Sequence, residues 1–535
     1  MRLPSFLRLV FFAFMLACPS SYAQEADHRS PLERISENEK SAFVVQDLFG
    51  RTINTEGLML VDWEGYLADP AIKFSLTPPR DTTFPATAIL SSKQTRLYFD
   101  LPSATGANGP RKEIVWRKRE SIPVHVSIFP DRDGDDETHQ FEIEFTDAGE
   151  KREHLVLPLR VIDQDRDRAD DFHVTVDFTQ DQTGFFKDEA ARATILQAAR
   201  DWAYFFADMR LRPVAAGSEK TMIWGPDGFK TASHVLNQKE YSGYLLYAYG
   251  IRNELQNADL SISAAWRLLK RNPAARAIRS GGEPSPAGGF QVAAGQAKPL
   301  RRSGGLELEV QGNYNTLGWR LTLADDDWWQ ATNHGDVKND LYSIAHHEIG
   351  HALIFNPNNS LVRRGAAIDD ARIRSYLGNL PTVSQSDHLE GTIDPDSMRG
   401  AFGNEYHGKM PRGRWLITKL DLLCAQAIGY DLRETSAFTP LSFAAAELPP
   451  GSVGAPYSAR LRASGGIPFY CWEVVEQLPA GLALDSFTGA ISGVPTQRGV
   501  SDFTVRVRDY SELGKGVTQR LQIEIGGADS AGCSE

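Results

Sequence analysis

Residues 141–145 read Phe-Glu-Ile-Glu-Phe, an alternation of apolar and charged side chains with a period of two. This period is typical of a strand with one buried and one solvated face. A second stripe of the same kind is formed by Val124, Val126 and Ile128. The alternation predicts an N-terminal β-sandwich over residues 24–168.

The apolar pattern changes twice further along the chain. From about 188 to 209 it has the helical period of an amphipathic helix, and from 445 onward alternation returns. The sequence therefore predicts several folded units. We expect a signal peptide at 1–23, the N-terminal β-sandwich at 24–168, a central α+β domain at 169–436, a C-terminal β-sandwich at 445–527 and a tail at 528–535.

Composition excludes some classes of function. The 535 residues are 41% hydrophobic and carry a formal charge of −12, without a Lys/Arg stripe, so no nucleic-acid partner is expected. Residues 1–23 combine a basic lead, a short apolar run and a small-x-small cleavage site, which predicts an exported, secreted or periplasmic protein without a transmembrane helix. Cys18 lies in an imperfect lipoprotein box, so lipid anchoring is the alternative.

The motif that indicates chemistry is His347-Glu348-Ile349-Gly350-His351. Residues four apart on a helix share a face, so His347 and His351 can bind one zinc ion while Glu348 reaches an attacking water. We expect His346 on the outer side of this helix, away from the metal.

A catalytic zinc site needs a third protein ligand. Ile354 and Pro357 stand where a compact motif would have its glycine and its third histidine, so that ligand must lie further along the chain. The candidates are Asp387, His388, Glu390, Asp394, Asp396, Glu405 and His407.

The N-terminal domain offers a second possible cation site. The loop Asp131-x-Asp133-Gly134-Asp135 contains the hard carboxylate oxygens that calcium prefers, but it lacks the later glutamate of an EF-hand. We interpret this loop as a solvated acidic turn, with a calcium site as the alternative.

Two resemblances to known families extend this interpretation. His388, followed by Met398 in Asp396-Ser397-Met398-Arg399-Gly400, resembles the third histidine and Met-turn of leishmanolysin-like metzincins, and 347–353 resembles matrixin-type zinc peptidases. The resemblance implies a central zincin or metzincin-like α+β catalytic domain with His388 as third ligand and Met398 as the Met-turn. The stretches at 478–485 and 488–496 resemble Ig-like, cadherin-like domains of secreted bacterial proteins.

The function expected from the sequence is that of a secreted zinc metalloendopeptidase that cleaves protein or peptide substrates by a metal-activated water. The Ig-like domain implies contact with a cell surface or matrix. Two alternatives stay open: an adhesion or binding protein with an inactive or structural zinc site, and a zinc hydrolase of non-peptide amides. If Glu405 were the third ligand, the site would be thermolysin-like.

Overall fold

The computed structural model describes most of the chain from residue 43 onward, and residues 43–535 form one compact unit. The described residues are 43–94, 96–99, 111–131, 134–166, 174–182, 184–207, 214–218, 220–224, 232–241, 244–252, 258–267, 291–296, 342, 345–346, 349–350, 354–355, 365–384, 389–390, 392–397, 416–427, 430–444, 447–511 and 516–527. The predicted signal peptide, the lipidation candidate Cys18 and the tail after residue 527 lie outside them.

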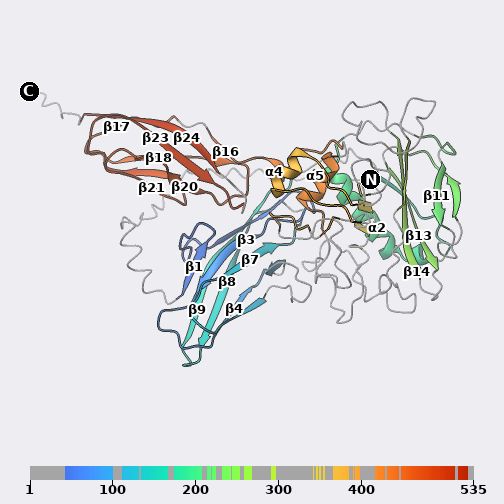
Figure 1. The fold of residues 1–535 in the computed structure, drawn as a ribbon, viewed down its shortest axis with the longest axis horizontal. Coiled ribbons are helices and arrows are strands. Elements are labelled where there is room, and N and C mark those ends of the chain that lie inside the picture. The colour runs from blue at the N-terminus through green and yellow to red at the C-terminus, as the bar shows by residue number, and fades with distance from the viewer. Residues whose placement is uncertain are drawn as a thin grey trace, which may run out of the picture. The chain divides into compact units, whose positions relative to one another are not determined.

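The first domain is a sandwich of two antiparallel or mixed sheets (Figure 1). One sheet has the order β1 (Val44–Asp47), β3 (Ile72–Thr77), β7 (Ile122–Ile128), β5 (Leu97–Phe99). The other has the order β2 (Leu58–Asp62), β9 (Arg152–Asp163), β8 (Glu137–Asp147), β4 (Ala86–Ser92), β6 (Arg111–Trp116). In the second sheet β2 runs parallel to β9, and Asp62 is paired in register with Asp163.

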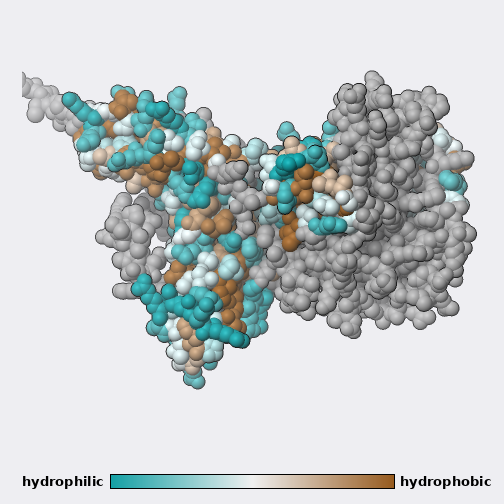
Figure 2. All heavy atoms as spheres, in the orientation of Figure 1, coloured by the Kyte–Doolittle hydropathy of each residue, from teal (hydrophilic) through white to brown (hydrophobic). Residues whose placement is uncertain are grey.

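Alternation along the strands builds the core between these sheets. Phe141 and Phe145 of β8 are buried, and Glu144 between them is exposed, as the period of two predicts. The ring of Phe141 meets the ring of Phe74, from the opposite sheet, edge-on at 5.9 Å. In Figure 2 hydrophilic and hydrophobic residues are interspersed on the outside of this sandwich. The core is therefore made by side chains from both sheets.

Strands also predominate in the described part of the central region. A four-stranded sheet has the order β10 (Val174–Asp177), β13 (Tyr244–Arg252), β14 (Ala258–Arg267), β15 (Gln291–Gln296), and β11 (Lys220–Trp224) pairs with β12 (Ala232–Leu236). The α-helices with described bounds are α2 (Glu189–Phe205), α4 (Ala371–Leu377) and α5 (Lys419–Ala427), and short 3-10 turns lie at η1 (Phe185–Lys187) and η4 (Ser436–Phe438).

The predicted fold class is wrong for this central region. The described residues are mostly strands with three short α-helices, which fits a β-sandwich or Ig-like architecture and not an α+β zincin or metzincin-like catalytic domain. The α+β expectation rested on the amphipathic stretch at 188–209 and on the helix expected around the motif at 347–351. Helical periodicity identifies a helix locally, but the pairing of the strands around it decides the class of the domain.

The C-terminal domain is a second sandwich. One sheet has the order β17 (Gly451–Ser452), β24 (Val517–Gly526), β23 (Gly499–Arg508), β20 (Cys471–Val474), and another the order β18 (Tyr457–Arg460), β22 (Ala490–Gly493), β21 (Leu482–Leu484). A short pair joins β16 (Ser442–Phe443) to β19 (Ala463–Ser464). Gly481 precedes β21 with φ of +90°, and a Cβ there would lie 2.0 Å from the carbonyl oxygen of Val494, so the turn requires glycine.

Polar and cation–π contacts join this domain to the first sandwich. The hydroxyl of Tyr510 donates a 2.9 Å hydrogen bond to Asp47 at the end of β1, and Arg51 forms an ion pair of 2.7 Å with the same carboxylate. The guanidinium of Arg51 also lies 4.0 Å from the ring centre of Phe487. These contacts continue the main hydrophobic cluster into the C-terminal domain, since Ile467 and Tyr510 belong to it.

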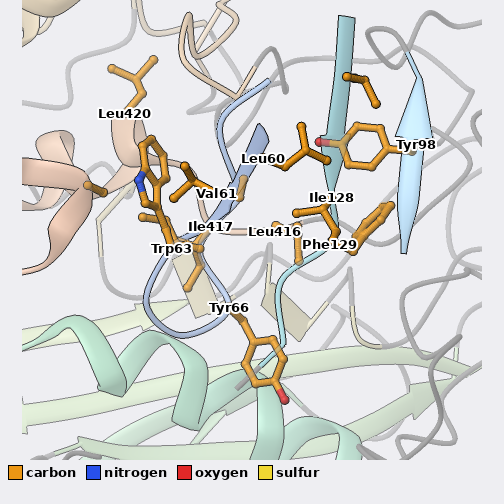
Figure 3. Packing of buried hydrophobic residues seen from close by; sticks show 14 of the residues in the cluster. Leu60, Val61, Trp63, Tyr66, Tyr98, Ile128, Phe129, Leu416, Ile417 and Leu420 are labelled. Carbon is orange, nitrogen blue, oxygen red and sulfur yellow. The ribbon is translucent and has the colours of Figure 1, made fainter. Parts of the chain in front are cut away.

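The loop after β2 packs against the segment that leads into α5. Figure 3 shows Val61 and Trp63 in one apolar cluster with Leu416, Ile417 and Leu420. The backbone N–H of Ala68 donates to the carbonyl of Ile417 at 2.7 Å. A backbone contact and buried apolar side chains thus fasten the first sandwich to the start of α5.

Candidate functional site

The residues of the predicted zinc site lie outside the part of the chain that the structure describes. This holds for His347, Glu348, His351, His388 and Met398. Several of their neighbours in the sequence are described, and these are helical and buried: Tyr342, Ala345, His346, Ile349 and Gly350. The site can therefore be built from the helix around the motif, from the helix α2 beside it and from the segment at 389–397.

The described helical residues around the motif form one buried face. Tyr342, Ala345, His346 and Ile349 follow the spacing i, i+3, i+4, i+7, and none is more than 3% exposed. This spacing places side chains on the same side of a helix. The face packs on α2, where the indole N–H of Trp202 donates to the backbone carbonyl of His346 at 3.0 Å.

The carboxylate of Asp201 in α2 lies at the centre of this contact. Its Oδ2 accepts a hydrogen bond from the hydroxyl of Tyr342 and lies 3.2 Å from Nε2 of His346. Its Oδ1 accepts from the side-chain amide of Gln197 at 2.6 Å. All four side chains are buried, so the carboxyl group of Asp201 joins polar side chains of two helices in the interior.

The expected outward position of His346 is wrong. The side chain is 3% exposed and faces Asp201 rather than solvent. The sequence analysis missed this pair because the two residues are 145 positions apart. Local periodicity does not predict which polar side chain of another helix will lie beside a given residue. The one available signal was an aspartate, Asp201, beside Trp202 in the predicted helix at 188–209.

Two of the alternative metal ligands are occupied by other contacts. Asp394 is fully buried, and its Oδ1 accepts hydrogen bonds from the hydroxyl of Tyr376 at 2.8 Å and from the N–H groups of Asp396 and Ser397 at 3.0 and 3.1 Å. Its Oδ2 accepts from the N–H of Leu420 at 2.7 Å. Both oxygens are therefore used to hold the turn at 394–397 against α4 and α5.

Electrostatics at this turn follow from burial. Desolvation raises the pKa of the Asp394 carboxyl, with the neighbouring Asp396 adding to the shift, and it raises the pKa of Tyr376 well above the usual range. The ammonium of Lys419 forms an ion pair of 2.9 Å with Asp396 and lies 4.9 Å from the ring centre of Tyr376. Asp396 is thus paired, and Glu390, the remaining described candidate, is exposed.

Two cysteines of the described chain are buried. Cys424 in α5 is fully buried, as its apolar setting predicts, and burial raises the pKa of its thiol well above the usual range, with Asp421 adding to the shift. Cys471 in β20 is also a free, buried thiol. Asp387, Glu405 and His407 lie outside the described residues, as does Cys533.

The comparisons with known proteins concern the C-terminal domain first. Residues 439–524 match the family described as Putative Ig domain, so the chain contains an Ig-like domain, as the resemblance at 478–496 implies. A domain of this kind suggests a binding role. No metallopeptidase family is among the matches, and no curated protein matches the chain.

Solved structures are similar over part of the chain. A putative alpha-galactosidase from Bacteroides fragilis is 34% identical over 17% of this chain and 18% of its own, with a TM-score of 0.15. A putative alpha-galactosidase/melibiase from the same organism is 28% identical over 17% and 19%, also with a TM-score of 0.15. A conjugative transposon lipoprotein from Bacteroides eggerthii is 10% identical over 22% and 96%, with a TM-score of 0.14. The chain thus spans less than a fifth of the first two proteins.

Within the described ranges, none of the helices has the length and apolar character that a membrane crossing requires.

Proposed function

We propose that this protein is an exported zinc-dependent hydrolase that cleaves peptide bonds, with His347 and His351 as zinc ligands and Glu348 as general base. The observation that carries the proposal is the sequence His-Glu-x-x-His at 347–351 within a stretch whose described residues are helical. Two histidines four positions apart on a helix project from one face and can share a metal ion.

The burial of the neighbouring residues supports this assignment. A helix turns about 100° per residue, so positions 347 and 351 would fall about 160° from the centre of a face made by Tyr342, Ala345, His346 and Ile349. That face is buried against α2. A helix fastened on one side leaves its other side for ligands, and the Asp201 network would hold its orientation.

The chemistry follows from the residue types. A bound zinc ion would supply Lewis acidity, lowering the pKa of the attacking water and polarising the scissile carbonyl. Glu348 would take the proton of that water and pass it to the leaving amine, first as base and then as acid. Such a carboxylate has no role in a purely structural site.

His388 is our proposal for the third ligand. The competing carboxylates Asp394 and Asp396 are engaged in hydrogen bonds or ion pairs, which weighs against metal binding by either. Glu405 remains the alternative, and it would make the ligand set two histidines and a glutamate.

A binding function is the second candidate, and the Ig-like domain at 439–524 favours it. In that case the chain would attach to a cell surface or matrix, and a zinc ion at 347–351 would be structural. A third possibility keeps the same residues but changes the substrate to a non-peptide amide, because pocket walls rather than metal ligands select the substrate.

Casein hydrolysis by the parent chain and by Glu348→Gln, with the zinc content of both preparations measured, tests the proposal. Glu113→Gln is the matched control, because Glu113 in β6 of the first sandwich is exposed and the same charge is lost. We expect zinc in all three, and cleavage by the parent and the control only. Zinc in all three with no cleavage of casein or of a small-amide panel would contradict a hydrolase and favour a structural site. Cleavage restricted to the small amides would select the non-peptide hydrolase. Absence of zinc would refute the metal site and leave the binding protein.

A further inference from the structure

A cluster of carboxylates lies at one end of the first sandwich. Asp62 ends β2 and Asp163 ends β9, and these strands run parallel with the two residues paired in register. Asp131, from the connection between β7 and β8, joins them, and one carboxylate oxygen of each residue lies within 4.8 Å of the others. Carboxyl ends of neighbouring parallel strands meet at one edge, so the topology itself brings these like charges together.

Neighbouring backbone contacts hold the three segments in this arrangement. The N–H of Asp131 donates to Oδ2 of Asp62 at 3.1 Å, and the N–H of Gln164 donates to the carbonyl of Asp62 at 3.0 Å. Asp163 receives a hydrogen bond from the N–H of Asp165 at 2.7 Å. The carboxylates are thus placed by folded backbone and not by chance proximity of mobile side chains.

Arg96 balances part of this charge. Its guanidinium forms ion pairs of 2.8 Å with Asp62, 2.6 Å with Asp131 and 3.1 Å with Glu137. A guanidinium carries one positive charge, whereas these three partners alone carry three negative ones when ionised. Asp163 adds a further carboxylate to the group. Arg96 thus faces the acidic side chains of three different segments.

Two buried oxygens point independently to a missing positive partner. Asp62 and Asp69 are both fully buried. Oδ2 of Asp62 and Oδ1 of Asp69 take hydrogen bonds, whereas Oδ1 of Asp62 and Oδ2 of Asp69 receive none from the residues that the structure describes. Buried polar atoms are almost always satisfied by protein, water or an ion.

We propose that Asp62, Asp131 and Asp163 bind a calcium ion. The donor set consists of hard carboxylate oxygens, which suits calcium or magnesium and not zinc, since zinc prefers histidine and cysteine. Calcium accepts irregular arrangements of six to eight oxygens, whereas magnesium demands a near-ideal octahedron. The ligands here come from two strand ends and a connecting loop, and Arg96 occupies one side, so the flexible coordination of calcium fits better.

This ion would stabilise the strand end from which the loop in contact with Ile417 begins. The loop after Asp62 contains Trp63 and Asp69, joined by a 2.7 Å hydrogen bond, and then Ala68, which binds the carbonyl of Ile417. Calcium at Asp62 would therefore fix the first residue of the loop that contacts the segment before α5. The interpretation of the acidic loop at 131–135 as a merely solvated turn is replaced, for Asp131, by a role in this site; Asp133 lies outside the described residues.

Calorimetric titration of the full chain with CaCl2, after treatment with EGTA, tests the proposal. Asp163→Asn removes a partly exposed ligand without a change of shape, and Asp131→Asn is the second variant should the first fail to fold by circular dichroism. The control is Asp81→Asn, an exposed aspartate of the same domain paired with Lys151. We expect one calcium ion per chain, an affinity about tenfold or more lower in either ligand variant, and no change in the control.

Thermal unfolding with and without calcium supplies a second readout. Calcium should raise the unfolding temperature of the parent and of Asp81→Asn, and it should raise that of Asp163→Asn much less. No binding by the parent at millimolar calcium would overturn the proposal, since Arg96 alone would then hold the cluster. If both ligand variants bound calcium with the same affinity as the parent, the proposal would be overturned too, because the ion would then bind elsewhere. Equal affinity for magnesium would refute the assignment to calcium.

Discussion

Replacing Asp201 with alanine is expected to loosen the contact between α2 and the helix that contains Tyr342 and His346. The carboxylate accepts hydrogen bonds from the Gln197 amide and the Tyr342 hydroxyl and faces Nε2 of His346. Alanine removes the carboxylate that these three buried side chains share. The substitution therefore tests whether this network, rather than apolar packing alone, fastens the helix.

The magnitude follows from the kind of interaction that is lost. Removing the acceptor of a buried donor costs about 1–3 kcal/mol, and the losses at neighbouring groups that share one acceptor do not simply add. We expect the free energy of local opening to fall by about 3–5 kcal/mol. Because about 1.4 kcal/mol corresponds to a factor of ten, amide exchange should accelerate by roughly 10²- to 4 × 10³-fold.

Hydrogen–deuterium exchange resolved by peptide is the suitable assay, because a chain with several domains need not unfold in one step. Peptides from α2 and from 342–350 should exchange faster in Asp201→Ala, whereas peptides from β23 and β24 should not change. Asp201→Asn keeps one acceptor and should show a smaller effect. Glu189→Gln, an exposed change on the same helix, is the matched control.

Three outcomes would refute this reasoning. Exchange in α2 that changes less than about fivefold would mean that the network contributes little beyond packing, given that 1 kcal/mol is a factor of about five. Acceleration of the same size in β23 and β24 would indicate global destabilisation. An effect of Glu189→Gln equal to that of Asp201→Ala would mean that the helix responds to any loss of charge.

The other predictions concern separate contacts. Arg51→Ala should lower the free energy of unfolding by about 3 kcal/mol, because the guanidinium pairs with a buried carboxylate and donates to a carbonyl of the C-terminal domain; an unchanged urea midpoint would contradict it. Tyr376→Phe should cost about 1–2 kcal/mol in the same assay, since Asp394 loses a buried donor, and a neutral result would show that its backbone donors suffice. Backbone hydrogen bonds hold the pKa of the Asp147 carboxyl below its usual range, and the bond from the N–H of Thr83 has the largest effect. The stability that this carboxylate adds is present above about pH 4 and is lost as the pH falls through its folded pKa. Asp147→Asn should thus unfold at a lower temperature than the parent at pH 7 but not at pH 2; a difference independent of pH would disprove this account.

The sequence by itself determined those strands that have one buried face and one solvent-exposed face. In β8 the buried Phe141, Ile143 and Phe145 alternate with more exposed glutamates, because successive strand residues point to opposite faces and burial selects every second one. The Ig-like resemblance of residues 478–496 was equally readable from the sequence, and the family match at 439–524 bears it out. These features depend on neighbours in the chain or on the pleat alone.

Only the tertiary structure decided the class of the central region and its polar contacts. Amphipathic stretches indicated helices, but the pairing of β10 with β13 across some seventy intervening residues has no local signature, and the α+β expectation failed there. The pair of Asp201 and His346, and the meeting of Asp62 with Asp131 and Asp163, likewise join positions distant in sequence. A buried charge is tolerable only beside its partner. The packing of whole helices and strands decides which residue becomes that partner, and the hydrophobic periodicity of the sequence carries no information about it.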